Sequence, residues 1–220
     1  MCIGVFARAP VPGRAKTRLI RRLGARRAAE LQAALILDTT RKVNKLARQA
    51  ARWFFLAGSA YPAFPRRSEW TLARQRGCDL GQRMDRAFCQ MLRRHRAAVI
   101  IGTDSPLLSP RLLRQALSEL QVCEAVLGPC PDGGFYLIGL RRTSPALFHG
   151  VRWSTRWAFR DMLRRLLRQG LSCAILEGLT DLDRPQDLAD LASGMARRPA
   201  LRASAPALWR FLKWKENRWK

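Results

Sequence analysis

Histidine is scarce in this chain, and no two cysteines form a C-x-x-C pair. The two histidines, His95 and His149, are too few and too scattered to build a zinc site, even beside six cysteines. Several of the cysteines fall in apolar or helical stretches and are instead expected to be small buried apolar residues of a protein kept in a reducing compartment. We therefore expect a cytoplasmic location and no zinc centre.

Long apolar runs are also missing, since no stretch approaches the length that crosses a membrane. The first strand is expected to begin at Cys2, which leaves no room for a signal peptide. The sequence therefore predicts no transmembrane segment.

Acidic residues are few, with 16 Asp and Glu against 41 Lys and Arg, so the net charge is +25. Such an excess attracts polyanions, and nucleic acid is the first partner to consider. The chain contains no helix-turn-helix pattern, zinc-finger spacing or RNP-type aromatic motif, so no specific nucleic acid is expected. A compositional preference for arginine explains the excess of positive charge better, with some of the cations concentrated where an anionic substrate binds.

Short apolar runs alternate with amphipathic segments along the chain. The expected strands cover residues 2–7, 53–57, 97–101, 125–128, 135–140 and 171–176. The expected helices cover residues 28–50, 80–94, 110–120, 157–169 and 185–191. This alternation predicts an α/β fold, with a mostly parallel sheet flanked by helices.

A chain of 220 residues is long enough for one such domain, which is expected over residues 1–196. Residues 197–220 form a basic tail that carries Trp209, Phe211, Trp214 and Trp219. An amphipathic helix that touches a membrane surface or a partner has this composition. A packed or frayed C-terminal helix has it as well, and the sequence leaves both open.

The segment G-T-D-S-P at residues 102–106 follows the apolar strand at 97–101. It delivers Asp104 to the carboxyl end of a central strand, where α/β sheets bind ligands. A carboxylate at that place suits a hard divalent cation, which in turn suits a phosphate-bearing substrate. A cap for the helix after Pro110, or an Asx turn, is the structural alternative for Asp104.

The loop after the first strand is rich in arginine. Gly13 allows close backbone approach, and Arg8, Arg14, Lys16 and Arg18 place four cations in one short segment. Such a cluster suits a diphosphate or triphosphate, although the spacing is not that of a Walker A loop. The alternative is a solvated basic turn.

Three later segments combine turn residues with polar groups. Gly81 and Arg83 would face a bound donor, although Asp79 and Gln82 nearby form a capping-box pattern. The run Asp132-Gly133-Gly134 makes either a tight hairpin or room for a bulky substrate. The motif W-S-T ends in Ser154 and Thr155, either of which could cap the following helix and help it to hold an anion.

The fifth segment carries two carboxylates, Asp181 and Asp183, ahead of the last predicted helix. One of them could lie beside Asp104, and two carboxylates are a sensible minimum for Mg²⁺ or Mn²⁺ that bridges phosphate oxygens. The structural alternative is that Asp183 caps the helix, with Pro185 in its first turn.

In this order the segments closely resemble a bacterial family of the GT-A glycosyltransferase superfamily, the DUF2064-type transferases associated with arsenosugar synthesis. The guanylyltransferases of coenzyme F420 synthesis and the molybdopterin nucleotidyltransferases are related. The resemblance runs from about residue 3 to residue 191. The stretches F-A-R-A-P-V-P-G-R-A-K-T-R-L and G-T-D-S-P are the most distinctive, supported by D-G-G-F-Y-L-I-G-L, W-S-T and D-L-D-R-P-Q-D-L.

The resemblance implies a nucleotide-diphospho-sugar transferase fold whose basic loop grips the nucleotide phosphates. It implies Asp104 as principal ligand of Mg²⁺ or Mn²⁺, Asp183 as the second ligand, and Asp181 as a further candidate. It places four residues on the acceptor side: Asp132, Gly133, Gly134 and Ser154. Asp132 is, by position alone, also the candidate general base.

These observations predict a metal-dependent transferase with a nucleotide-activated donor and a small-molecule acceptor. Glycosyl transfer from a nucleotide sugar is the leading version, and nucleotidyl transfer from a nucleoside triphosphate with release of pyrophosphate is the second. A non-catalytic polyanion-binding protein is the third, because the surface is so basic.

Overall fold

The structure is a computed structural model that describes residues 1–58 and 69–216, apart from the side chains of residues 214–216. Trp214 and Trp219 of the predicted basic tail therefore lie outside the described side chains. Within the described helices, none combines the length and apolar character that crossing a bilayer requires.

The described chain forms strands and helices in alternation. The strands are β1 (Cys2–Arg8), β2 (Ala51–Ala57), β3 (Thr71–Arg74), β4 (Ala98–Ile101), β5 (Ala125–Pro129), β6 (Phe135–Leu140) and β7 (Cys173–Ile175). The helices are η1 (Thr17–Leu19), α1 (Ile20–Leu23), α2 (Ala25–Asn44), α3 (Leu80–Leu92), α4 (Pro110–Val122), α5 (Pro145–Phe148), α6 (Ala158–Arg168), α7 (Pro185–Arg197), α8 (Pro199–Ser204) and α9 (Pro206–Glu216).

The strands form one sheet in the order β3-β2-β1-β4-β6-β5-β7. Strand β6 runs antiparallel to its neighbours β4 and β5, and the remaining pairs are parallel. The predicted α/β class with a mostly parallel sheet is thus confirmed. Because β1 pairs with β4 from Cys2 to Val5, the ends of both strands reach the same edge of the sheet.

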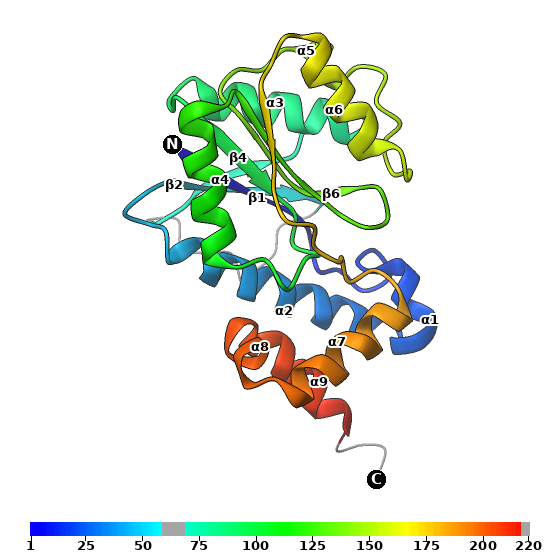
Figure 1. Ribbon diagram of the computed structural model, residues 1–220. Helices are drawn as coiled ribbons and strands as arrows, with labels where there is room; N and C mark the ends of the chain where they lie inside the picture. Colours follow the sequence, from blue (N-terminus) through cyan, green and yellow to red (C-terminus); the bar gives the residue numbers. More distant parts are fainter. Residues whose placement is uncertain (59–68, 217–220) are drawn as a thin grey trace.

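Helices cover both faces of the sheet (Figure 1). Helices α2 and α4 bury one cluster of apolar side chains against it, and α3, α5 and α6 bury a second cluster on the opposite face. Burial on both faces explains why β1 and β4 read as continuous apolar runs rather than as alternating patterns.

The sequence did not predict the edge strand β3, whose residues are only half-buried and carry no clear apolar run. Three predicted elements differ clearly in their bounds. Helix α2 spans Ala25–Asn44 instead of residues 28–50, β7 covers only three residues, and α7 continues to Arg197 instead of ending at residue 191. Short edge strands are the elements that pattern reasoning detects least well, because they bury little apolar surface.

The C-terminal segment packs on the far side of α2, below the sheet in Figure 1. Leu208, Phe211 and Leu212 of α9 share a buried cluster with Leu31 and Leu35 of α2. This is the packed helix that the sequence left open as one alternative for the tail. The hydrophobic burial explains the aromatic composition of this part of the tail without a membrane contact.

A buried carboxylate joins α9 to α2. Asp38, only 3% exposed, accepts hydrogen bonds from the backbone N–H groups of Ala207 at 3.0 Å and Leu208 at 2.8 Å. These N–H groups belong to the first turn of α9, which has no partners for them within the helix. A side chain of one helix therefore caps another.

We expect Asp38→Ala to lower the free energy of unfolding by about 1–3 kcal/mol, because two buried N–H groups lose their acceptor. Urea denaturation followed by circular dichroism measures the change. Asp190→Ala, at an exposed acid of α7, is the matched control and should change stability by less than about 0.5 kcal/mol. Equal effects of the two substitutions would contradict the capping role.

Candidate functional site

A cavity of about 870 Å³ opens at the carboxyl edge of the sheet. Its walls come from the loops after β1, β3 and β4, from the β5–β6 turn, and from the segments before α6 and α7. Eleven of the predicted site residues line it: Arg8, Arg14, Lys16, Arg18, Arg83, Asp104, Asp132, Gly134, Ser154, Asp181 and Asp183. Residues far apart in the sequence thus meet in one cavity, at the place that the strand ends predicted.

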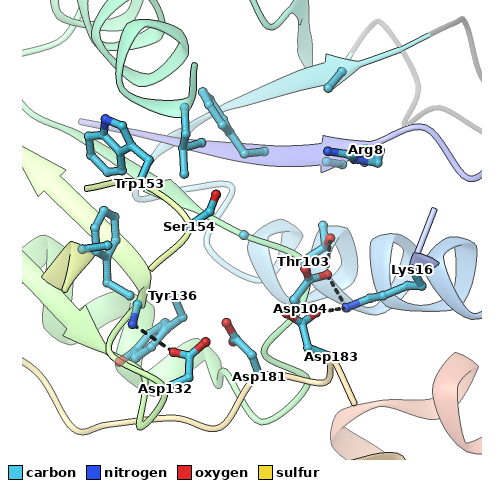
Figure 2. A pocket seen from close by; sticks show the side chains of 18 of the residues that line it. Arg8, Lys16, Thr103, Asp104, Asp132, Tyr136, Trp153, Ser154, Asp181 and Asp183 are labelled. Carbon is cyan, nitrogen blue, oxygen red and sulfur yellow. Dashed lines mark hydrogen bonds and ion pairs between the residues drawn. The ribbon is translucent and has the colours of Figure 1, made fainter. Parts of the chain in front are cut away.

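Lys16 holds two of the carboxylates together (Figure 2). Its Nζ lies 2.9 Å from Oδ1 of Asp104 and 3.1 Å from Oδ1 of Asp183, and it donates to the carbonyl oxygen of Leu182. The side chain is 4% exposed, and its burial lowers the pKa of Lys16, but the two carboxylates outweigh burial and the net pKa is raised. Lys16 is therefore a charged, buried cross-link between two loops.

Asp104 and Asp183 remain accessible to a ligand, with 42% and 35% of their side chains exposed. Neither caps the helix that follows it. Ser109 accepts from the backbone N–H of Leu112 at the start of α4, and Asp187 accepts from the N–H groups ahead of α7. The capping alternatives for both aspartates are therefore excluded, and both side chains line the cavity, where Oδ2 of Asp183 also pairs with Nη1 of Arg18 at 3.1 Å.

Asp181 lies deeper than the other two carboxylates and accepts a hydrogen bond from the Ser105 hydroxyl. Burial raises the pKa of Asp181 to about 6. The negative charge of Asp104 acts in the same direction, and the hydrogen bond from Ser105 opposes it. Asp181 therefore changes its protonation state just below neutral pH.

Five arginines line the cavity without an acidic partner among the described residues: Arg8, Arg14, Arg83, Arg156 and Arg184. Arg8, Arg14 and Arg83 belong together, because all three also line a smaller pocket beside the cavity. Arg8 donates to the carbonyl oxygen of Arg14 at 3.4 Å, and Nε of Arg83 donates to that of Gly77 at 3.0 Å. These bonds orient the side chains of Arg8 and Arg83, and since both acceptors are neutral carbonyl groups, the positive charges stay uncompensated. The three guanidinium groups thus form a ready site for an anion.

Helix α2 supplies residues that the sequence did not single out. Gln32, only 3% exposed, donates through Nε2 to Oγ1 of Thr103 at 3.1 Å and to the carbonyl oxygen of Arg8 at 3.4 Å. Lys42, also buried, donates to the carbonyl oxygen of Pro106 at 2.6 Å. Both are polar residues at buried positions of a mostly apolar helix face, which also carries Asp38, Thr39 and Thr40, and that signal could have revealed them. They fix the loop that carries Asp104.

The run of residues 132–134 forms the predicted tight hairpin and also borders the cavity. Oδ1 of Asp132 accepts a hydrogen bond from the N–H of Gly134 at 2.9 Å, and the Asp132 side chain is exposed at the turn. Gly133 does not line the cavity but packs beneath it, where a Cβ would lie 1.9 Å from the carbonyl oxygen of Arg156. Gly133 is thus needed for close packing of two loops.

Ser154 lies on the cavity wall with a positive φ of 61°. It does not cap α6. Thr155 Oγ1 instead accepts from the N–H of Trp157 at 3.2 Å and donates to the carbonyl oxygen of Arg152 at 2.7 Å. Of the two residues that the sequence proposed as caps, Thr155 therefore orders the start of the helix.

Gly81 and Gly13 also lie outside the cavity lining. Gly81 is buried under Trp153, and a Cβ there would lie 2.6 Å from the indole Nε1. Asp79 accepts from the N–H of Gln82 at 2.8 Å, which confirms the predicted capping contact at the start of α3. Gly81 thus supports a residue of the cavity wall, while its neighbour Arg83 lines the cavity itself.

The donor chemistry of the carboxylates fits a divalent metal that arrives with phosphates. Mg²⁺ prefers oxygen ligands and needs only one or two carboxylates when phosphate oxygens complete its shell. Asp104 and Asp183 supply exposed carboxylates, although no cluster of three or more ligating side chains occurs among the described residues. The site therefore fits a metal shared with a substrate better than a resident metal held by protein alone.

We expect Lys16→Met to lower the free energy of unfolding by about 1–3 kcal/mol at pH 7, because it leaves two neighbouring carboxylates without their shared cation. Urea denaturation at pH 7 measures the loss, with Lys45→Met at an exposed lysine as the control. Equal losses for the two substitutions would argue against the ion pairs.

Asp181 should make stability depend on pH. Because its folded pKa of about 6 exceeds the ordinary 3.8, the native state holds the extra proton, and stability falls as pH rises from about 4 to about 6. The full effect corresponds to about 3 kcal/mol. Asp181→Asn should lack this fall, so its stability relative to the natural protein should increase between pH 4 and pH 7. Parallel stability curves would refute the raised pKa.

Comparisons with known proteins agree with this architecture. The chain is 32% identical to the 2-phospho-L-lactate guanylyltransferase of Methanopyrus kandleri over 99 residues, which are 42% of this chain and 48% of that enzyme. The chain thus spans about half the length of the curated relative that it matches.

Two solved structures have a similar fold. One is a protein of Desulfovibrio desulfuricans G20 with the provisional name nucleotide-diphospho-sugar transferase; it is 28% identical, with a TM-score of 0.87 over 98% of this chain and 95% of that one. The other is 2-C-methyl-D-erythritol 4-phosphate cytidylyltransferase of Thermus thermophilus; it is 18% identical, with a TM-score of 0.51 over 90% of this chain and 100% of that one.

A family profile matches residues 27–155, which hold Asp104 and the β5–β6 turn. The basic loop and the pair Asp181 and Asp183 lie outside this match but inside the likeness to the Desulfovibrio protein. The matched family is described as "Uncharacterized protein conserved in bacteria (DUF2064)". Since the match covers more than half of the chain and agrees with the predicted resemblance, this protein belongs to the DUF2064 family.

Proposed function

We propose that this protein is a transferase with a nucleotide-activated donor, and that it transfers a nucleotidyl group from a nucleoside triphosphate to a small acceptor. One observation carries the proposal. The unpaired cations Arg8, Arg14 and Arg83 line the same cavity as the exposed carboxylates Asp104 and Asp183. Guanidinium groups bind phosphate oxygens, and carboxylates bind the metal that accompanies them.

In such a reaction an oxygen of the acceptor attacks the α-phosphorus, the bond to the bridging oxygen breaks, and pyrophosphate leaves with the electron pair. Arg8, Arg14 and Arg83 would bind the phosphates and stabilise the charge that develops on the leaving group. Asp104 and Asp183 would hold Mg²⁺ or Mn²⁺, which would neutralise phosphate charge when bound. Lys16 would hold these two carboxylates in their relative positions through its ion pairs with both.

The order of the two leading candidates thus differs from that favoured by the sequence. Nucleotidyl transfer gains support because the curated relative is named a guanylyltransferase and because the cluster of Arg8, Arg14 and Arg83 has no acidic partner among the described residues. Glycosyl transfer from a nucleotide sugar is the second candidate, supported by the name of the Desulfovibrio protein, whose likeness spans nearly the whole chain. In that case a nucleoside diphosphate leaves instead of pyrophosphate.

Ligand-dependent thermal stability tests the proposal without knowledge of the acceptor. A triphosphate with Mn²⁺ at about one hundred times its Kd should add about 2.7 kcal/mol of stability and raise Tm. Asp104→Asn should remove the Mn²⁺-dependent part of this increase, measured against the variant's own Tm without ligand, because the substitution also removes one ion pair of Lys16. Asp190→Asn, exposed on α7, should behave like the natural protein.

The alternatives give different patterns in the same assay. Stabilisation by nucleotide sugars but not by triphosphates would favour glycosyl transfer. A response to a short oligonucleotide alone, independent of Mn²⁺ and lost with added salt, would replace the enzyme with a polyanion-binding protein. Full Mn²⁺-dependent stabilisation of Asp104→Asn would refute the assigned metal ligand.

A further inference from the structure

One large apolar side chain in the cavity wall is unusually accessible to solvent. Six large apolar residues are well exposed in the described part of the chain, and of these only Leu80, which is 39% exposed, lines the cavity. Leu80 opens α3, next to the buried Gly81. Exposed apolar surface inside a ligand cavity, unlike scattered surface residues, indicates a contact with an apolar part of a ligand.

Two aromatic side chains extend this apolar surface. Phe135 and Trp153 both line the cavity, and their rings pack edge to face with 6.2 Å between centroids. Trp153 also packs against Phe148, and its indole rests on Gly81, where no side chain larger than hydrogen fits. The apolar wall thus combines side chains of α3, of β6 and of the segment before α6, and the contacts with Phe148 and Gly81 hold Trp153 in place.

The apolar wall lies away from the ionic part of the cavity. Trp153 and Ser154 occupy one side of the view in Figure 2, and Arg8 and Lys16 occupy the other, with Asp104 next to Lys16. A donor with its phosphates near Arg8 and Asp104 therefore leaves the Trp153 side for the second substrate. A small, fully polar acceptor would not use such a wall.

A cation, Arg156, lies close to Trp153 of the apolar wall in the sequence. Arg156 lines the cavity three residues after Trp153, is exposed, and forms no ion pair with any described residue. Its guanidinium lies 4.9 Å from the ring centroid of Trp157, which holds the side chain near the cavity mouth. Arg160 contacts the same ring at 5.8 Å but does not line the cavity.

We infer that Leu80, Phe135, Trp153 and Arg156 form the acceptor subsite, and that the acceptor is amphiphilic, with an anionic group beside an apolar chain or ring. This inference rests on the proposed function, because it takes the other side of the cavity as the donor site. The apolar part of the acceptor contacts Leu80 and the two aromatic rings, and its anionic group pairs with Arg156.

A series of alkyl phosphates tests the subsite by binding alone. Methyl, propyl and pentyl phosphate are titrated into the full chain by calorimetry, with inorganic phosphate as the reference. The titrations are carried out with and without a saturating triphosphate and Mn²⁺. Each methylene that reaches the wall should tighten Kd by about twofold to fourfold.

Matched variants assign the effect to named side chains. Arg156→Ala should weaken binding of every alkyl phosphate about tenfold, whereas Arg160→Ala, at the neighbouring arginine on Trp157, should leave Kd unchanged. Leu80→Ala should reduce the gain per methylene and leave binding of inorganic phosphate as it was. Leu80 is 39% exposed and lies outside the buried core, so its truncation removes little core packing.

The outcomes separate this inference from the proposed function. No gain with chain length, or equal effects at Arg156 and Arg160, would overturn the subsite. Displacement of pentyl phosphate by the nucleotide would overturn it as well, because the wall would then belong to the donor site. A protein that binds the alkyl series as expected but no nucleotide would retain the subsite and lose the proposed function.

Discussion

The cavity depends on one buried ammonium group. Lys16 contributes the positive charge that allows Asp104 and Asp183 to lie side by side, and it ties the loop after β1 to the loop after β4 and to the segment before α7. Two carboxylates this close would repel each other without a shared cation. The backbone of Lys16 adopts a left-handed conformation, with φ 46° and ψ 47°, so this contact is made at a conformational cost that the surrounding bonds must outweigh.

Helix α2 connects the loop of Asp104 to the C-terminal segment. Gln32 and Lys42 hold the loop of Asp104, and Asp38, one turn before Lys42, caps α9. Burial lowers the pKa of Lys42 to about 8, and the charge of Asp38 opposes this shift. These polar groups are retained in an apolar environment because each has a partner. The basic C-terminal segment is thereby attached to the helix that supports the site.

The distribution of charge and apolar surface divides the cavity by chemistry. Arg8, Arg14 and Arg83 surround one part with uncompensated positive charge, and Leu80 and Trp153 give another part an apolar wall. Phosphate binding is electrostatic, whereas an apolar contact is driven by release of water, so the two parts suit unlike ligands. Under the proposed function the cavity would hold the donor and the acceptor in fixed positions, and such positioning accelerates group transfer.

The α/β class, the alternation of elements and the position of Asp104 at a strand end follow from the order of residues alone, because buried strands and turn residues leave local patterns. The arginine-rich loop and the carboxylates near α7 are visible at that level too. Which cations remain free depends on the folded arrangement: Lys16 looks like its arginine neighbours in the sequence, yet it is bound to carboxylates far along the chain, at Asp104 and Asp183. Likewise, the folded arrangement places Gly81 beneath Trp153 and Gln32 beside Thr103. Such contacts join distant segments, and no local periodicity records them.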